Sequence, residues 1–431
     1  MCEMHIYTAP HAVTREVAAA RTDQESAMAR PTRALRNLPQ PTRRQLLLGA
    51  ASFSAASLLA ACGGSGADSD DGTAAASFTS GPISGFGSVV VGGVRFDDTL
   101  AVIVDEDGNR ATRADLKLGC VVDIDAGRID RAEARAVALR IMLGGALVGP
   151  LGSVDTTAST LTLLGQTVLV TTSTVFDDTL TGGLGGLTPG SVYQVWGLFD
   201  AANARFLATR IAPAAGATEY RLRGLVTELD TTARTFKIGS ELVDYAGVPN
   251  ADVARTLANG QFVRVTLQTT QVNGAWVAIR LRHSVRTWEP RPEVHVEGVI
   301  TVFHTLQSFE INGLQVNATD AIFPDGTAGI VQGARVEVEG AIVNGVLVAT
   351  KVELEDRRDR GRRVLEFRGT MSNLDTTAKT FALRGLTIWY GGAVTYANGT
   401  EATLANDKFV EVKGVISTDH TRIEARRIEF R

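Results

Sequence analysis

From about residue 81 to the C-terminus, apolar and polar residues alternate in short runs. Residues 334–340 and 408–414 alternate in this way through their whole length, and a second run follows each of them, at residues 348–354 and 422–428. A period of two predicts a β-strand with one face against a core and the other in solvent. The pattern therefore predicts an all-β protein built from many short strands.

The strand-like runs are arranged in copies. Asp-Thr-Thr-Ala separates two runs at residues 155–158, 230–233 and 375–378. An aspartate that opens a turn can accept hydrogen bonds from backbone amides two residues on, so we expect hairpins here. The opening glycines are Gly149, Gly224, Gly298 and Gly369. Their nearly constant spacing predicts tandem repeats, with a more divergent first copy starting near Gly81.

Each copy contains five expected strands and a turn before the fourth, for example the Leu-x-x-Gly of residues 257–260. Five strands with a helical turn at this place predict an OB-like five-stranded β-barrel, and a closed barrel leaves few unpaired strand edges. A β-sandwich is the alternative. We expect the repeats at residues 81–143, 144–213, 219–283, 293–356 and 364–431.

The N-terminal segment, which precedes Cys62, follows a different pattern. Arg43 and Arg44 come before an uncharged, largely apolar run that ends at Ala61. The run is short for a membrane span but typical of a signal peptide, so residues 1–61 are interpreted as an export segment. The arginine pair resembles a twin-arginine motif, although the lysine common after the leucine pair is absent. General secretion and twin-arginine export therefore both remain open.

The residues before Cys62 read Leu-Ala-Ala and resemble the lipobox of bacterial lipoproteins, in which the cysteine sulfur receives diacylglycerol. Two acyl chains are enough for stable anchoring to a membrane. Residues 62–80 are small and polar and predict a flexible tether behind the lipidated cysteine. Gly63 stands where an aspartate would favour retention at the inner membrane. The expected location is thus the bacterial envelope, with the outer membrane favoured.

Charge changes the expected partners. The chain has a formal charge of −4, but the segment before Cys62 holds seven arginines and four acids, so the remainder carries −7. An acidic, exported protein is not expected to bind nucleic acid, even though OB-like barrels with aromatic side chains can stack bases. The tryptophans considered for stacking are Trp196, Trp276 and Trp389. The basic cluster at residues 357–363 is interleaved with acids and fits a solvated linker.

Paired carboxylates are the first candidates for chemistry. Phe-Asp-Asp-Thr-Leu occurs twice and places Asp97 beside Asp98 and Asp177 beside Asp178. Such pairs can serve acid–base chemistry or hold a cation. The simpler interpretation is an aromatic core residue followed by a polar turn. Aromatic residues at similar places in the other copies are Tyr245, Phe323 and Tyr396.

Other candidates are weaker. Residues 105–109 begin like a calcium loop, but Leu116 stands where a bidentate glutamate is needed, so a hairpin turn is favoured. Cys120 is the one cysteine left after Cys62 and is expected to be a buried structural thiol. The histidines at 283, 295, 304 and 420 lack metal-ligand spacing. No nucleophile elbow or phosphate-binding loop occurs, so neither catalytic residues nor a cofactor are expected.

The lipobox, the tether and repeats that open with Gly-Val-x-x-x-Asp and close with Val-x-Val-x-Gly resemble the bacterial family of domain of unknown function 5666. The resemblance covers roughly residues 81–431 and implies an OB-like fold and an envelope location, with no catalytic residues. The first copy departs most, with Asp125 where Gly340 and Gly414 stand. Our hypothesis is a lipid-anchored, non-enzymatic scaffold that binds a protein or glycan partner. The alternative is a metal-dependent enzyme or cation-binding factor that uses the Asp-Asp turns.

Overall fold

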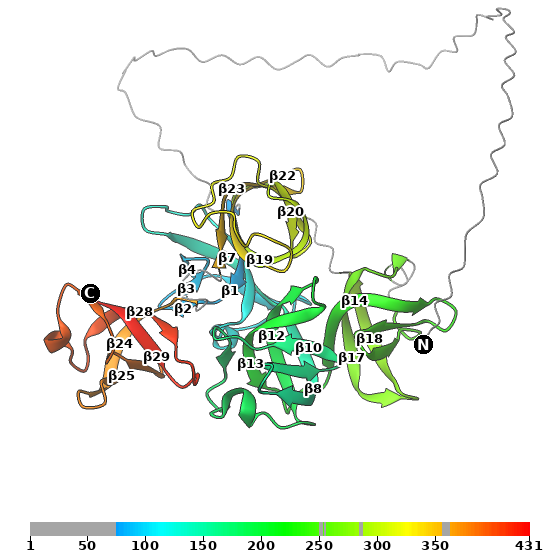
Figure 1. Ribbon diagram of the computed structural model, residues 1–431, viewed down its shortest axis with the longest axis horizontal. Coiled ribbons are helices and arrows are strands. Elements are labelled where there is room, and N and C mark those ends of the chain that lie inside the picture. The colour runs from blue at the N-terminus through cyan, green and yellow to red at the C-terminus, as the bar shows by residue number, and fades with distance from the viewer. Residues whose placement is uncertain (1–74, 250–252, 254–255, 284–287, 356–362) are drawn as a thin grey trace, which may run out of the picture. The chain divides into compact units, whose positions relative to one another are not determined.

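A computed structural model describes residues 75–249, 253, 256–283, 288–355 and 363–431. The export segment, Arg43, Arg44 and Cys62 lie outside these residues. The described part is all-β, and its helical content consists of short turns (Figure 1). In this part of the chain, no helix has both the length and the apolar character needed to cross a membrane.

The strands form five groups along the chain, one for each repeat. The first repeat holds β1 (Ser77–Pro82), β2 (Gly85–Phe86), β3 (Val89–Val91), β4 (Val94–Asp97), β5 (Val102–Asp105), β6 (Val121–Ala126) and β7 (Arg135–Gly144). The second holds β8 (Ala146–Asp155), β9 (Thr160–Leu163), β10 (Gln166–Leu169), β11 (Val175–Phe176), β12 (Val192–Asp200) and β13 (Arg205–Pro213). The third holds β14 (Tyr220–Asp230), β15 (Thr235–Ile238), β16 (Glu241–Asp244), β17 (Phe262–Val272) and β18 (Ala275–His283).

The last two repeats follow the same plan. The fourth holds β19 (Arg291–Thr305), β20 (Ser308–Ile311), β21 (Leu314–Asn317), β22 (Arg335–Val343) and β23 (Val346–Leu354). The fifth holds β24 (Leu365–Asp375), β25 (Thr380–Leu383), β26 (Leu386–Trp389), β27 (Thr395–Ala397), β28 (Phe409–Ile416) and β29 (Ile423–Phe430). Short 3₁₀ turns precede the fourth strand of the first, second and fifth barrels, at Arg113–Asp115, Gly183–Gly186 and Glu401–Thr403.

Each repeat closes into a barrel, as the fourth one illustrates. β19 pairs with β20, β20 with β21, and β21 runs parallel to β23. β23 pairs with β22, and β22 returns to β19, which completes a five-stranded ring. The ring confirms the expected OB-like barrel and excludes the sandwich. In the third repeat, β14 to β18 repeat this order of pairing.

A glycine marks the bulge in the fourth strand of the second, fourth and fifth repeats, whereas the third repeat has Leu267 there. The register between β22 and β23 shifts at Gly340, where a Cβ atom would lie 2.1 Å from the carbonyl oxygen of Val348. Gly414 occupies the same place in the fifth repeat, where an added Cβ atom would lie 2.5 Å from the carbonyl oxygen of Glu424. In the first repeat the shift falls at Ala126. The residue that replaces the glycine is therefore Ala126, and the sequence comparison that placed Asp125 there was wrong by one position.

The Asp-Thr-Thr-Ala segments form the hairpin turns expected of them. The Oδ1 atom of Asp230 accepts hydrogen bonds from the amides of Thr232 and Ala233, both at 2.8 Å. Asp155 and Asp375 accept equivalent pairs of hydrogen bonds. The side chain thus satisfies two turn amides that have no partner in the strand ladder.

Each barrel also has its own core. Phe96 and Ile124 are fully buried in the first, Phe236 and Val265 in the third, and Phe309 in the fourth. These cores are separate clusters of inward-facing residues, as alternate burial along each strand requires. The repeats are therefore individual barrels rather than parts of one undivided core.

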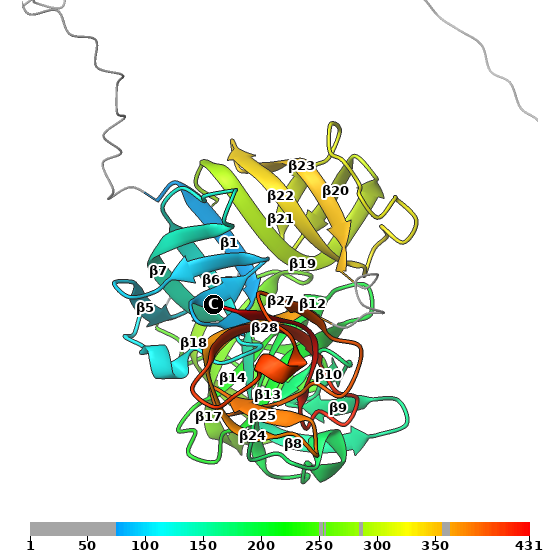
Figure 2. The same cartoon turned by 90° about the vertical axis from the view of Figure 1, so that its left-hand side faces the viewer.

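Strand pairing also joins different repeats. β1 runs parallel to β19 of the fourth repeat, from Ser77 opposite Glu293 to Ser80 opposite Val296, and antiparallel to β6 of its own barrel (Figure 2). β2 pairs with β24 of the fifth repeat, and β8 pairs with β14 between the second and third. Residues 77–80, expected in the tether, are thus strand residues, because they are buried between two ladders.

Candidate functional site

The carboxylate of Asp97 organises its own turn. Its Oδ1 atom accepts hydrogen bonds from the amide of Thr99 at 2.9 Å and from the Thr99 hydroxyl at 2.5 Å. These bonds lower the pKa of Asp97 below its usual value. Asp98 pairs instead with Arg113, at 3.0 Å. Each acid therefore has a local partner, as expected of a polar turn.

The second acidic pair has a similar turn at a different place. Thr179 donates to Asp177 through its amide and hydroxyl, and Arg210 contacts the other carboxylate oxygen at 2.5 Å. Partial burial alone would raise the pKa of Asp177, but the Thr179 bonds and the Arg210 charge outweigh it and lower the pKa. Arg210 also donates to the carbonyl oxygen of Leu118 in the first repeat.

The two Phe-Asp-Asp segments are not structurally equivalent. Phe96 lies in the third strand of its barrel, opposite Ala136 of β7. Phe176 lies in the additional strand β11 and pairs further along the fifth strand of its barrel, opposite Ile211. The expectation of one recurrent acidic turn is thus corrected, because the segments follow different strands. Both aromatic side chains are nevertheless buried, as expected of core residues.

Residues 105–109 form a turn, which we call the acidic loop, and its acids face arginines. Asp105 accepts hydrogen bonds from the amides of Asp107 and Asn109, at 2.9 and 2.8 Å, and so shapes the loop. Glu106 contacts Arg223 and lies 2.9 Å from Arg264, both of the third repeat. Asp107 lies 2.9 Å from Arg264.

Burial alone would raise the pKa of Glu106, but the two arginine charges reverse the effect and lower the pKa to about 2. The Gly145 amide adds a hydrogen bond to the Glu106 carboxylate at 2.9 Å. These carboxylates are thus bound by guanidinium groups of another repeat.

Similar ion pairs link the first repeat to the last two. Arg95 of β4 contacts Glu366 of β24 at 2.8 Å, and both side chains are largely buried. Arg131 contacts Glu293 of β19 at 3.0 Å, and the amide of Ile129 donates to the same carboxylate. Charged side chains of the first repeat therefore contact the third, fourth and fifth repeats.

The thiol and two of the three tryptophans considered for stacking are buried. Cys120 is free and fully buried, and burial raises its pKa to about 11, so it carries little thiolate at neutral pH. Trp196 of the second repeat is buried against the core of the first, and Trp276 is buried in the core of the third. The indole of Trp276 donates to Glu241 at 2.6 Å. Trp389 is half-buried, with the Arg422 guanidinium 4.7 Å from the centre of its ring.

The structure also brings together three residues that sequence spacing did not connect. His295 of β19 and Glu337 and Glu339 of β22 each place one metal-ligating atom within 4.8 Å of the other two. His295 is opposite Glu339 in the antiparallel pair. Two further strands, β20 and β21, separate them in the chain, so only the strand register could have revealed the cluster.

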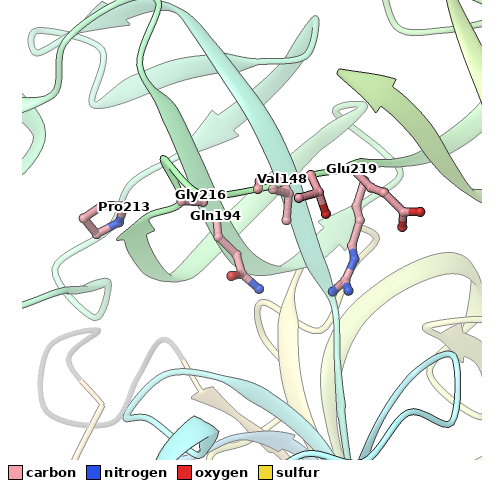
Figure 3. Close-up of a pocket in the computed structure, with 9 residues that line it drawn as sticks. Val148, Gln194, Pro213, Gly216 and Glu219 are labelled. Carbon is pink, nitrogen blue, oxygen red and sulfur yellow. The ribbon is translucent and has the colours of Figure 1, made fainter. Parts of the chain in front are cut away.

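A cavity of about 350 Å³ lies where the second repeat continues into the third (Figure 3). Val148 and Gln194 reach it from strands, and Gly216 and Glu219 from the connecting segment. Arg221 of β14 completes its polar lining. Glu219 is paired with Arg280 at 2.5 Å, so the cavity offers an amide and ionic groups for hydrogen bonding.

Comparison with known proteins gives one family. No curated protein matches the chain. The solved structure titled "drosophila Unr CSD456" aligns at 15% sequence identity, over 49% of this chain and 97% of that one, with a TM-score of 0.13. A TM-score this low supports no statement about shared fold or function. The model of the family "Domain of unknown function (DUF5666)" matches residues 148–212, 297–353 and 368–429. The second, fourth and fifth barrels of this chain therefore match the DUF5666 model.

Proposed function

We propose that this chain is a lipid-anchored, non-enzymatic scaffold of the bacterial envelope, whose barrels form a platform for a protein or glycan partner. The observation that carries the proposal is the use of the charged side chains of the first repeat. Glu106, Asp107, Arg95 and Arg131 contact partners in three other repeats. These charged side chains form ion pairs between barrels, and a scaffold needs such contacts to hold its domains together.

Strand pairing supports the same function. The first repeat contributes β1 and β2 to ladders with the fourth and fifth repeats, while the second and third are joined through β8 and β14. Backbone ladders fix neighbouring barrels more firmly than a flexible linker does. Several linked binding surfaces also add their affinities without needing a strong contact at any one of them.

The cavity between the second and third repeats is where we place the partner. Gln194, Glu219 and Arg221 provide amide, carboxylate and guanidinium groups, which hydrogen-bond to sugar hydroxyls or to a peptide backbone. A photo-crosslinking residue at Gly216, which lines the cavity, should capture the partner in intact cells. The same residue at Gly247, away from the cavity, is the control; equal capture at both positions would argue against this surface.

The envelope location is tested through Cys62. The wild-type chain should incorporate a labelled fatty acid and fractionate with membranes, whereas Cys62→Ser should remain unlabelled and leave the membrane fraction. A Cys2→Ser variant is the control, because Cys2 precedes the expected cleavage point. Labelling of Cys62→Ser, or recovery of the wild type in the cytoplasm, would contradict the proposal.

A further inference from the structure

We propose that His295, Glu337 and Glu339 bind a divalent metal ion of the first transition row, and we expect this ion to be Zn²⁺. Their ligating atoms lie within 4.8 Å of one another, and Nδ1 of His295 is 4.0 Å from Oε1 of Glu339. In a tetrahedral zinc site with bonds of about 2.1 Å, two ligand atoms lie about 3.4 Å apart. Nδ1 and Oε1 would therefore have to approach each other by roughly 0.6 Å to bind the same ion. Rotation of two side chains supplies such a shift without moving the strands.

The imidazole provides evidence that is independent of the acids. Nδ1 of His295 is buried and has no hydrogen-bond partner among the described residues. A buried polar atom without a partner costs free energy, and Glu337 and Glu339 each place a carboxylate oxygen within 4.8 Å of a ring nitrogen of His295. An imidazole nitrogen that faces two carboxylates is stabilised either by a proton on that nitrogen or by a cation between the three groups.

The first repeat leaves room at this place. Gly92 lies over the cluster: a Cβ atom there would be 3.0 Å from Oε1 of Glu337 and 3.9 Å from Cβ of His295. Gly92 also has a φ of +54°, which glycine adopts without strain. The absence of a side chain leaves space for an ion and its remaining ligand, such as a water molecule.

The barrel fold does not explain the histidine or the glutamate that faces it. In the fifth repeat, the positions of His295 and Glu339 hold Glu366 and Lys413, which pair as an ordinary ion pair at 3.0 Å. The other repeats also differ at these two registers. Their residue pairs are Phe78 with Asp125, Ala146 with Trp196, and Arg221 with Thr266. The histidine and its facing glutamate are thus a property of the fourth repeat alone.

The donor set suggests which ion fits. One imidazole nitrogen and two carboxylate oxygens suit Zn²⁺ and its first-row neighbours, and three protein ligands leave one tetrahedral position open. Glu337 also has a favourable charge interaction with the buried guanidinium group of Arg363. A carboxylate can bind a metal through one oxygen while the other keeps its contact with a neighbouring side chain.

Lys351 competes for the same carboxylate. Its ammonium group contacts Glu339 and lies 3.0 Å from Glu353. The bound ion would displace Lys351 from Glu339, and Glu353 would retain it. Removing this charge should therefore strengthen metal binding, an effect that a purely structural role of the cluster does not predict.

The test is calorimetric titration of the full chain, purified without a polyhistidine tag, with Zn²⁺. His295→Gln and Glu339→Gln should each lose one equivalent of Zn²⁺, with affinity at this site reduced at least about 100-fold. Lys351→Met should bind several-fold more tightly. His304→Gln, on the same strand but exposed, is the matched control and should bind as the wild type does.

Replacing Zn²⁺ by Co²⁺ gives a second readout, since visible absorption reports nitrogen and oxygen ligands directly. The bands should be present in the wild type and in His304→Gln and absent in the two ligand variants. Thermal unfolding establishes that each variant is folded, and if His295→Gln is not, Glu339→Gln decides. Unchanged stoichiometry in a folded ligand variant, or no specific Zn²⁺ binding by the wild type, would overturn the proposal.

Discussion

Glu106 shows how one side chain joins two barrels. It lies in a loop, yet only 20% of its side chain is exposed, because Arg223 and Arg264 of the third repeat enclose it. A carboxylate removed from water is stable only when paired, and two guanidinium groups provide the pairing. The pairing stabilises the charged form, so the pKa of Glu106 falls from an ordinary 4.5 to about 2.

The shift predicts how stability depends on pH. Because the folded pKa lies below the unfolded one, the Glu106 contribution is complete above about pH 5 and is lost as the pH falls towards 2. The size of the shift corresponds to about 3 kcal/mol. Glu106→Gln should therefore lower the free energy of unfolding at pH 7 by about 2 to 4 kcal/mol and flatten this part of the acid profile. Denaturant titrations at several pH values measure both effects.

The control for this prediction is Glu133→Gln. Glu133 pairs with Arg135 at 3.2 Å, but both side chains are more than half exposed. Exposed pairs contribute less than about 1 kcal/mol, so this variant should change little at any pH. Equal effects of the two substitutions would show that Glu106 does not link the repeats as described.

At the scale of the element, the bulge in the fourth strand explains why a glycine closes the second, fourth and fifth repeats. The backbone of β23 approaches Gly340 so closely that a methyl group would overlap the Val348 oxygen at 2.1 Å. Gly340→Ala should separate β22 from β23 and lower stability by about 2 kcal/mol or more. Thermal unfolding measures the loss.

Gly247→Ala is the matched control, because nothing lies within 4 Å of the methyl group it would add. It should be close to neutral, since alanine reduces the freedom of the unfolded chain without a clash. If Gly340→Ala left the thermal stability unchanged, β22 and β23 would accommodate the methyl group without loss of stability. The bulge would then not explain the glycine of the repeat motif.

The sequence predicts what depends on neighbouring residues. Alternation identifies β22 and β28, and the Asp230 turn is recognisable because the aspartate binds amides two and three residues on. It does not predict contacts set by register between distant strands. Ser77 pairs with Glu293, which lies three repeats further along the chain, so a segment that reads as a polar tether is a buried strand.

The candidate site follows the same rule. The Asp-Asp turns can be recognised in the sequence, because Asp97 and Asp177 accept hydrogen bonds from threonines two residues further along the chain. His295 and Glu339 are separated in the chain by β20 and β21 and meet only through the pairing of β19 with β22. Spacing rules for metal ligands apply along one helix or loop, and a site across two strands has no fixed spacing in the chain.

At the scale of the whole described unit, five separate cores coexist with ladders that continue from one barrel into the next. β1 takes part in two ladders at once, with β6 inside the first barrel and with β19 of the fourth. A barrel that shares a strand edge cannot open without exposing unpaired amides and carbonyls of its neighbour. The first repeat should therefore couple the stability of the fourth and fifth repeats to its own.

This coupling can be measured by replacing Ile124, which is fully buried in the first core and lies opposite Thr79 of β1. Ile124→Ala should cost about 2 to 5 kcal/mol and loosen β1 and β2. Amide hydrogen exchange should then speed up in β19 and β24, although neither strand contains the substitution. Val265→Ala, equally buried in the third repeat, should leave those two strands unchanged. If exchange after Ile124→Ala rises only within β1 to β7, each barrel is stable by itself, and the ladders between repeats do not transmit stability.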